Sequence, residues 1–166
     1  MKKFFITLAL VFAFPVLASA VEAEHGTIYS VNGYGHFGTM QGYGLDFGAT
    51  FHTRPDNDIS PIIYFSFGFG GLDNNFYLDL NLLGGVSWHL TSFFYADLAG
   101  GVQGFMQLGE QSQLGGAFVA DASVLLHLAE LIGLRAGCMV SFGTNGSLIS
   151  PHVGLSSVFD FSWLFN

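Results

Sequence analysis

Three histidines recur at nearly equal intervals along the chain, at His52, His89 and His127. Imidazole nitrogens bind transition metals and exchange protons near neutral pH, so a metal site or a proton relay is one interpretation. The other is that they are polar side chains at repeated strand ends and hold no ligand. We expect the second, and therefore no metal, because neighbouring members would lie two strands, roughly 10 Å, apart along a sheet.

Acidic residues form a second set that could do chemistry, with one arginine as the available counter-charge. Carboxylates buried without partners take up protons or find donors and water, so we expect a structural polar network in which Arg135 pairs with Asp160. Because rings of acidic side chains attract cations, a water-filled cation path is the alternative. The residues assigned to this network are Asp46, Asp79, Asp97, Asp121, Arg135 and Asp160.

Serine and histidine come close in sequence twice, as Ser87 with His89 and as His152 with Ser156. Catalysis also needs a group that orients the base, with all members within hydrogen-bond reach. Neither pair lies in a catalytic motif, and matches this loose usually arise by chance. We expect no catalytic residues and no cofactor.

The composition is unusually apolar for a chain of 166 residues. Only 10% of the residues are charged, whereas a soluble domain usually carries about a quarter. The chain also contains 19 phenylalanines and 23 glycines. Something other than water must therefore face much of its surface.

The first residues have the three parts of a secretory signal peptide. Two lysines precede an apolar run from Phe4 to Leu17, and Ala18-Ser19-Ala20 follows. A transmembrane anchor is the alternative, but Pro15 interrupts the run, which is shorter than the roughly 20 residues that a spanning helix needs. We expect cleavage after Ala20 and a single mature domain, residues 21–166. Its acidic excess makes nucleic acid a poor partner.

Apolar residues alternate with small or polar ones along the mature chain. From Tyr43 to His52, the odd positions read Tyr, Leu, Phe, Ala, Phe and the even positions Gly, Asp, Gly, Thr, His. This period of two predicts strands with two different faces. The same pattern recurs between turn-forming residues. The predicted strands are Thr27 to Gly38, Tyr43 to His52, Ile59 to Gly70, Phe76 to His89, Phe94 to Met106, Phe118 to Leu128, Ile132 to Phe142 and Pro151 to Phe165.

These segments predict an all-β fold, a transmembrane eight-stranded antiparallel up-and-down β-barrel. Lipid would take the apolar row, and the narrow interior would take the small and polar row. A soluble β-sandwich fits less well, because the polar row is too rich in Gly, Ser and Asp for a core and the apolar row too rich in Phe, Leu and Val for water. If the N-terminus starts in the periplasm, the three histidines lie near the periplasmic mouth.

The last predicted strand carries the most specific pattern. Its aromatic row alternates with other residues up to the chain end and resembles the C-terminal targeting strand of bacterial outer-membrane barrels, although Asn166 rather than an aromatic is last. The resemblance implies recognition by the barrel-assembly machinery. The residues that carry it are Phe159, Phe161, Trp163 and Phe165.

The whole mature chain is similar in pattern to the small outer-membrane barrels grouped around outer membrane proteins A, X and W and the opacity proteins. Such families include structural barrels, adhesins, narrow channels and a few lipid-modifying enzymes, so the fold does not settle the function. We expect a monomeric, non-catalytic protein of the bacterial outer membrane, with a packed polar lumen, outer-membrane lipid around it and short outer loops. The alternatives are a narrow water or cation channel and, less favoured, a lipid-modifying enzyme.

Overall fold

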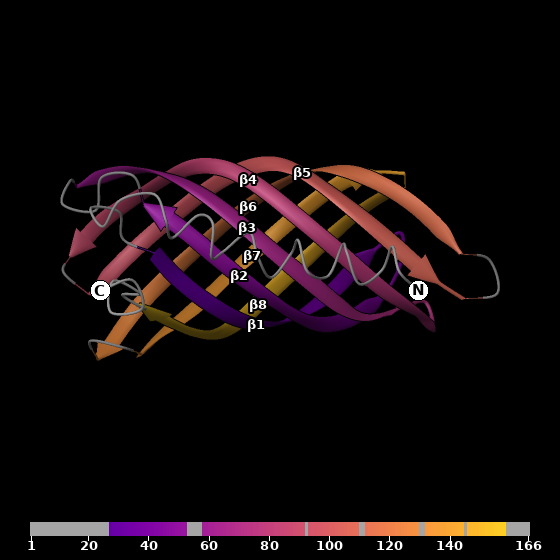
Figure 1. The fold of residues 1–166 in the computed structure, drawn as a ribbon, viewed down its shortest axis with the longest axis horizontal. Helices are drawn as coiled ribbons and strands as arrows, with labels where there is room; N and C mark the ends of the chain where they lie inside the picture. Colours follow the sequence, from indigo (N-terminus) through magenta and orange to yellow (C-terminus); the bar gives the residue numbers. More distant parts are fainter. Residues whose placement is uncertain are drawn as a thin grey trace, which may run out of the picture.

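A computed structural model describes residues 27–52, 58–91, 93–109, 112–129, 132–144 and 146–158. They form eight β-strands that run obliquely to the long axis of the molecule (Figure 1). No described residue belongs to a helix long and apolar enough to cross a membrane. The strands are β1 (Thr27–Gly38), β2 (Gly42–His52), β3 (Ile59–Leu72), β4 (Asn75–Thr91), β5 (Phe94–Leu108), β6 (Gln113–Ala129), β7 (Ile132–Gly143) and β8 (Gly146–Val158).

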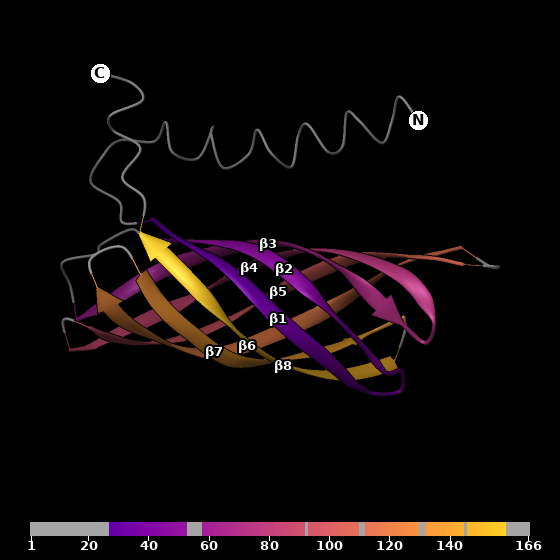
Figure 2. The same ribbon diagram turned by 90° about the horizontal axis from the view of Figure 1, so that it is seen from below.

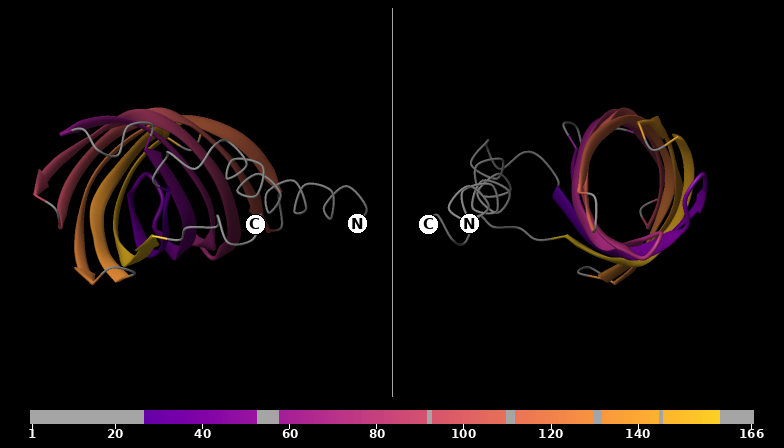
Figure 3. Two further views of the ribbon diagram at one scale, coloured as in Figure 1. Left: turned by 60° about the vertical axis from the view of Figure 1, so that its left-hand side comes forward. Right: turned by 90° about the vertical axis from the view of Figure 1, so that its right-hand side faces the viewer.

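Each strand pairs antiparallel with the next one, and β1 pairs antiparallel with β8, so the sheet closes into a barrel. Figure 2 shows β8 lying beside β1, and the view along the axis in Figure 3 shows the closed ring. The predicted fold class is confirmed. The strand period explains it, because every strand turns one row of side chains outward and the other inward.

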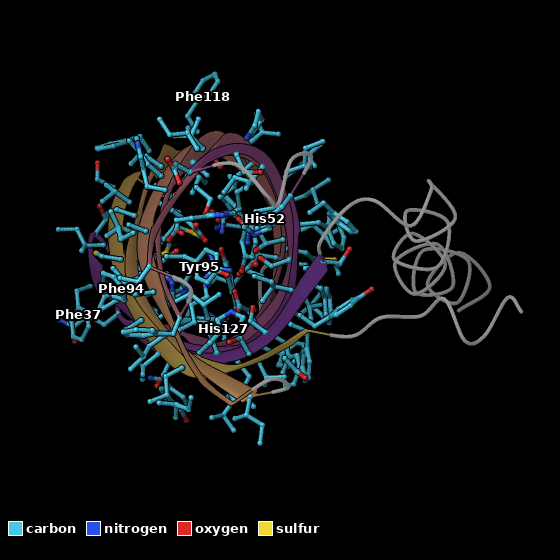
Figure 4. All side chains as sticks on the ribbon, turned by 90° about the vertical axis from the view of Figure 1, so that its left-hand side faces the viewer. Phe37, His52, Phe94, Tyr95, Phe118 and His127 are labelled. Atoms are coloured by element: carbon cyan, nitrogen blue, oxygen red, sulfur yellow. The ribbon has the colours of Figure 1, made fainter. Side chains whose placement is uncertain are left out.

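The two rows face as predicted. Outward side chains are apolar and exposed, and Figure 4 shows Phe37 and Phe118 pointing away from the ring while His52, Tyr95 and His127 lie inside it. Phe118 is 75% exposed and Leu114 is 85% exposed. An apolar belt of this kind suits hydrocarbon and not water.

Two strands begin several residues earlier than predicted, because glycines before the predicted start continue the ladder. β6 begins at Gln113, opposite Gln107, and not at Phe118. In the same way β8 begins at Gly146, well before Pro151. A glycine keeps its backbone N–H and C=O, so it can extend a paired strand although it contributes no side chain.

The turn between β3 and β4 is a two-residue hairpin. Asp73 has φ of 47° and Asn74 has φ of 64°. Type I′ hairpins need positive φ at both central residues, and Asp and Asn tolerate it better than other side-chain-bearing residues do. The predicted turn from Gly71 to Asn75 is therefore confirmed, with tighter bounds.

Several predictions fall outside the described residues. They concern the signal peptide, residues 1–20, and the C-terminal segment with Asp160, Phe159, Phe161, Trp163 and Phe165. They remain predictions from the sequence.

The outward apolar row leads to a first prediction. Leu82→Arg, in the middle of β4, should lower the free energy of unfolding by about 2–4 kcal/mol, because it places a charge in the centre of the apolar belt. The measurement is urea unfolding in phospholipid vesicles. Leu114→Arg is the matched control beside the β5–β6 turn, where about 0–1 kcal/mol is expected. Equal losses at both positions would argue against a membrane-spanning belt.

Candidate functional site: the polar lumen

The inward rows of the eight strands fill the barrel with polar side chains. The aspartates assigned to the lumen that lie in the described strands are all buried, with exposed fractions of 7% for Asp46, 4% for Asp79, 7% for Asp97 and 2% for Asp121. Arg135 is 3% exposed. Buried charges of this kind are expensive unless they are paired or hydrogen-bonded, so their partners decide what the lumen can do.

Arg135 on β7 is the centre of one polar network. Its Nη1 donates to Thr50 Oγ1 at 3.1 Å, its Nη2 donates to Ser123 Oγ at 2.9 Å, and Nη2 lies 3.4 Å from Asp121 Oδ2. The guanidinium also lies over the ring of Tyr64, 4.5 Å from its centroid. Because Thr50 belongs to β2 and Asp121 to β6, this one side chain joins walls on different sides of the lumen.

The predicted pairing of Arg135 with Asp160 stays a prediction, because Asp160 lies beyond the described part of the chain. The β7–β8 register places Gly154 opposite Arg135. The acidic partner in the structure is Asp121, on the other neighbouring strand. His152 also faces Asp121, with 3.7 Å between Nε2 and Oδ1.

A second network surrounds the carboxylates of Asp46 and Asp79. Asn32 Nδ2 donates to Asp46 Oδ1 at 2.7 Å, and the hydroxyl of Tyr64 donates to Asp46 Oδ2 at 3.2 Å. Asn81 Nδ2 donates to Asp79 Oδ1 at 2.8 Å. Tyr64 and Asn81 are thus two of the donors to these aspartates. Asn32 was missed, although its even position in β1 places it on the inward row.

A small internal cavity of about 20 Å³ lies in this part of the lumen, lined among others by Tyr34, His36, Asp46, Asp79 and Asn81. This is room for one or two water molecules. Beside it, His36 Nδ1 is hydrogen-bonded to Ser150 Oγ at 2.6 Å, and the His36 ring packs against Tyr77 with 5.5 Å between centroids. Since His36 lies on β1 and Tyr77 on β4, these rings also meet across the lumen.

The three predicted histidines gather with Tyr95 at the opposite end of the lumen (Figure 4). The ring centroids of His52 and His89 are 5.6 Å apart, closer than strand spacing suggested, because the side chains converge inside a curved wall. Tyr95 lies 4.6 Å from His89 and 5.0 Å from His127. Its place between them was not foreseen, although it shares their inward parity.

The histidine cluster is not a ready metal centre. The Nε2 atoms of His52, His89 and His127 have no hydrogen-bond partner in the structure. Within the described ranges, no group of three or more His, Cys, Asp or Glu side chains is arranged to hold a metal ion. Ring packing around Tyr95 is therefore what holds these side chains together.

Neither serine–histidine pair forms a catalytic arrangement in the structure. Ser87 Oγ has no hydrogen-bond partner, so His89 cannot activate it in this geometry. His152 Nε2 lies over Gly137 and faces Asp121, whereas Ser156 Oγ lies over Gly133, at a different level of β7. Ser156 and His152 therefore lie at different levels of the lumen.

The Arg135 network leads to a second prediction. Arg135→Met should lower the free energy of unfolding by about 3–5 kcal/mol, because it leaves Asp121 buried beside no arginine. Adding Asp121→Asn removes that charge, so the double variant should be more stable than Arg135→Met alone. Urea unfolding followed by tryptophan fluorescence would measure both. A double variant that is less stable than Arg135→Met would show that the two side chains are not coupled in this way.

Comparisons with known proteins bear on the fold. No protein-family model matches the chain, and no curated protein matches it in sequence. Among solved structures, Ail, the attachment invasion locus protein of Yersinia pestis, superposes with a TM-score of 0.61 at 11% identity, covering 84% of this chain and 100% of Ail. Neisserial surface protein A gives a TM-score of 0.56 at 10% identity, covering 82% of this chain and 98% of that one.

The N-terminal β-barrel domain of Pseudomonas aeruginosa OprF is similar to the same extent. Its TM-score is 0.55 at 11% identity, and the match covers 81% of this chain and 99% of that domain. At sequence identities this low, the similarity extends to the fold alone and says nothing of the activity. The chain has the fold of the small eight-stranded outer-membrane β-barrels.

Proposed function

We propose that this protein is a non-catalytic, monomeric barrel of the bacterial outer membrane whose lumen is closed by its own side chains. It contributes to envelope structure or to surface contacts and not to transport. The observation that carries this proposal is the set of contacts that cross the lumen. Arg135 on β7 bonds to Thr50 on β2, and His36 on β1 packs against Tyr77 on β4.

The outward face supports the membrane location. Large apolar side chains on β1 to β8 are exposed around the ring, and their natural surroundings are lipid tails. Export by a signal peptide, residues 1–20, and delivery by the barrel-assembly machinery through the C-terminal aromatic row complete the proposal. Both rest on the sequence.

The size of the polar cavity supports a closed lumen. The polar cavity beside Asp46 and Asp79 measures about 20 Å³, which holds one or two waters and not a hydrated ion column. Eight-stranded barrels are just wide enough for side chains to fill them. A continuous water path would require several of these side chains to move together.

The short connections support a modest role at the surface. The β3–β4 turn consists of Asp73 and Asn74, and residues 39–41 join β1 to β2. Binding sites on barrels are usually built from longer loops. A receptor-like function would therefore have to use the barrel wall or the rim.

A cation conduit is the second candidate, and one observation favours it. Four buried aspartates face a lumen in which Arg135 is the sole lysine or arginine of the described chain. Acidic linings attract cations. The two candidates differ in whether the side chains that cross the lumen block the path.

Planar-bilayer recording separates the two candidates and provides a third prediction. The refolded wild type should give no current steps, because its lumen is filled. Removing two crossing side chains, with Arg135→Ala and Tyr64→Ala combined, should open a path and give steps. Cation-selective currents in the wild type that fall in Asp97→Asn or Asp121→Asn would instead establish the conduit.

A fourth prediction concerns catalysis. Expression of the protein should leave the mass of lipid A unchanged, because neither serine–histidine pair is arranged for acyl transfer or hydrolysis. Mass spectrometry of extracted lipid A is the measurement. A mass change that disappears with His89→Ala or His152→Ala would show that the barrel is a lipid-modifying enzyme.

A further inference from the structure

Two aspartates flank a glycine inside the barrel. The backbone register places Gly68 of β3 opposite both Asp46 of β2 and Asp79 of β4. Gly68 has no side chain, so the carboxylates can lean over the middle strand. A Cβ at position 68 would lie 2.7 Å from Asp79 Oδ1, so the glycine provides the space that this carboxylate occupies.

Among the described residues, neither of these carboxylates forms an ion pair with an arginine, lysine or histidine. Arg135 bonds to Asp121, Thr50 and Ser123 and acts on Asp46 only at longer range, as does His152. The charged group that acts on Asp79 is Asp46, which has the same sign. Two ionised carboxylates in this position would repel each other, so the pair needs a positive charge or protons.

Other side chains that line the same cavity also have atoms without partners. They are the hydroxyl of Tyr34, the side-chain carbonyl oxygen of Asn81 and Nε2 of His36. Asn81 is 3% exposed, and its amide nitrogen is already used by Asp79 and Ser66. A buried carbonyl oxygen without a donor is costly, and Asn81 lines the cavity that the carboxylates share.

We propose that this cavity is a calcium site, in which Asp46 and Asp79 supply the charge and Asn81 and Tyr34 supply neutral oxygen. Carboxylate, amide and hydroxyl oxygens are ligands that hard cations prefer, and two carboxylates balance a divalent ion. A cavity of about 20 Å³ has room for the ion and little water. Mg²⁺ keeps several waters and demands a strict octahedron, so it fits this space less well than Ca²⁺.

The site adds to the proposed function and does not depend on it. Its donor set contains two carboxylates and neutral oxygens, which differs from the clusters of three His, Cys, Asp or Glu that the described residues lack. A bound ion would tie β2 to β4 through the lumen. It would leave Asp97, at the histidine end, outside the site.

Terbium luminescence tests the site and provides the fifth prediction. Tb³⁺ replaces Ca²⁺ on oxygen ligands and emits when a nearby tyrosine is excited, and Tyr34 lines the cavity. Because the cavity lies inside the barrel, the ion is added while the full chain refolds. The wild type should emit with one ion per chain, and Ca²⁺ should displace the signal at lower concentration than Mg²⁺.

The variants locate the signal. Asp79→Asn should reduce terbium binding at least tenfold, whereas Asp97→Asn, with the same loss of charge away from the cavity, should leave it unchanged. Gly68→Ala keeps every charge but displaces the Asp79 carboxylate, so it should also lose the signal. Heat-dependent gel mobility confirms that each barrel is folded.

Three outcomes would overturn the proposal. In the first, the folded wild type gives no tyrosine-sensitised emission. In the second, Mg²⁺ displaces the bound terbium as readily as Ca²⁺ does. In the third, Asp97→Asn lowers the emission as much as Asp79→Asn does. If Asp79→Asn does not fold, Asp46→Asn replaces it, since it removes the other carboxylate charge and leaves Tyr34 in place as the sensitiser. Asp46→Asn should weaken terbium binding several-fold, and unchanged binding would count against the site.

Discussion

In hydrocarbon, a backbone N–H or C=O group without a partner costs several kcal/mol, and the pairing of β1 with β8 leaves the described strands without an open edge. This closure sets the width of the ring. Once eight strands form a ring, the strand period sends one row of side chains to the lipid and the other into a narrow interior. The apolar belt and the polar lumen are thus two results of one hydrogen-bonded closure.

The narrow interior also brings side chains from distant strands into contact. A lumen of this width allows Arg135 to reach Thr50 and allows His36 to meet Tyr77. It also concentrates carboxylates where water is scarce. With Asp121 served by Arg135, the carboxylates of Asp46 and Asp79 share the cavity beside Gly68. How these two carboxylates are neutralised is the chemical property of the lumen that packing alone does not resolve.

The strands and their faces could be predicted because the period-two alternation survives in every segment. The starts of β6 at Gln113 and of β8 at Gly146 could not be predicted, because glycine forms turns and also extends a ladder. Only the pairing with the neighbouring strand decides between the two. Which side chains contact one another inside the lumen could not be predicted either. Arg135 pairs with Asp121, and His52 lies beside His89, because of the strand register and the curvature of the barrel wall. The alternation of residues along a strand predicts which face a side chain takes, but not these contacts.

The reach of Arg135 has a consequence for how the barrel comes apart. Its partners lie on β2 and β6, while the residue itself belongs to β7. When any one of these three strands moves away, at least one hydrogen bond of Arg135 is lost. Each strand is also hydrogen-bonded to both of its neighbours around the ring. Opening therefore does not stop at one strand. The amide protons of β2 and β7 should exchange with solvent together, in a single cooperative opening of the barrel.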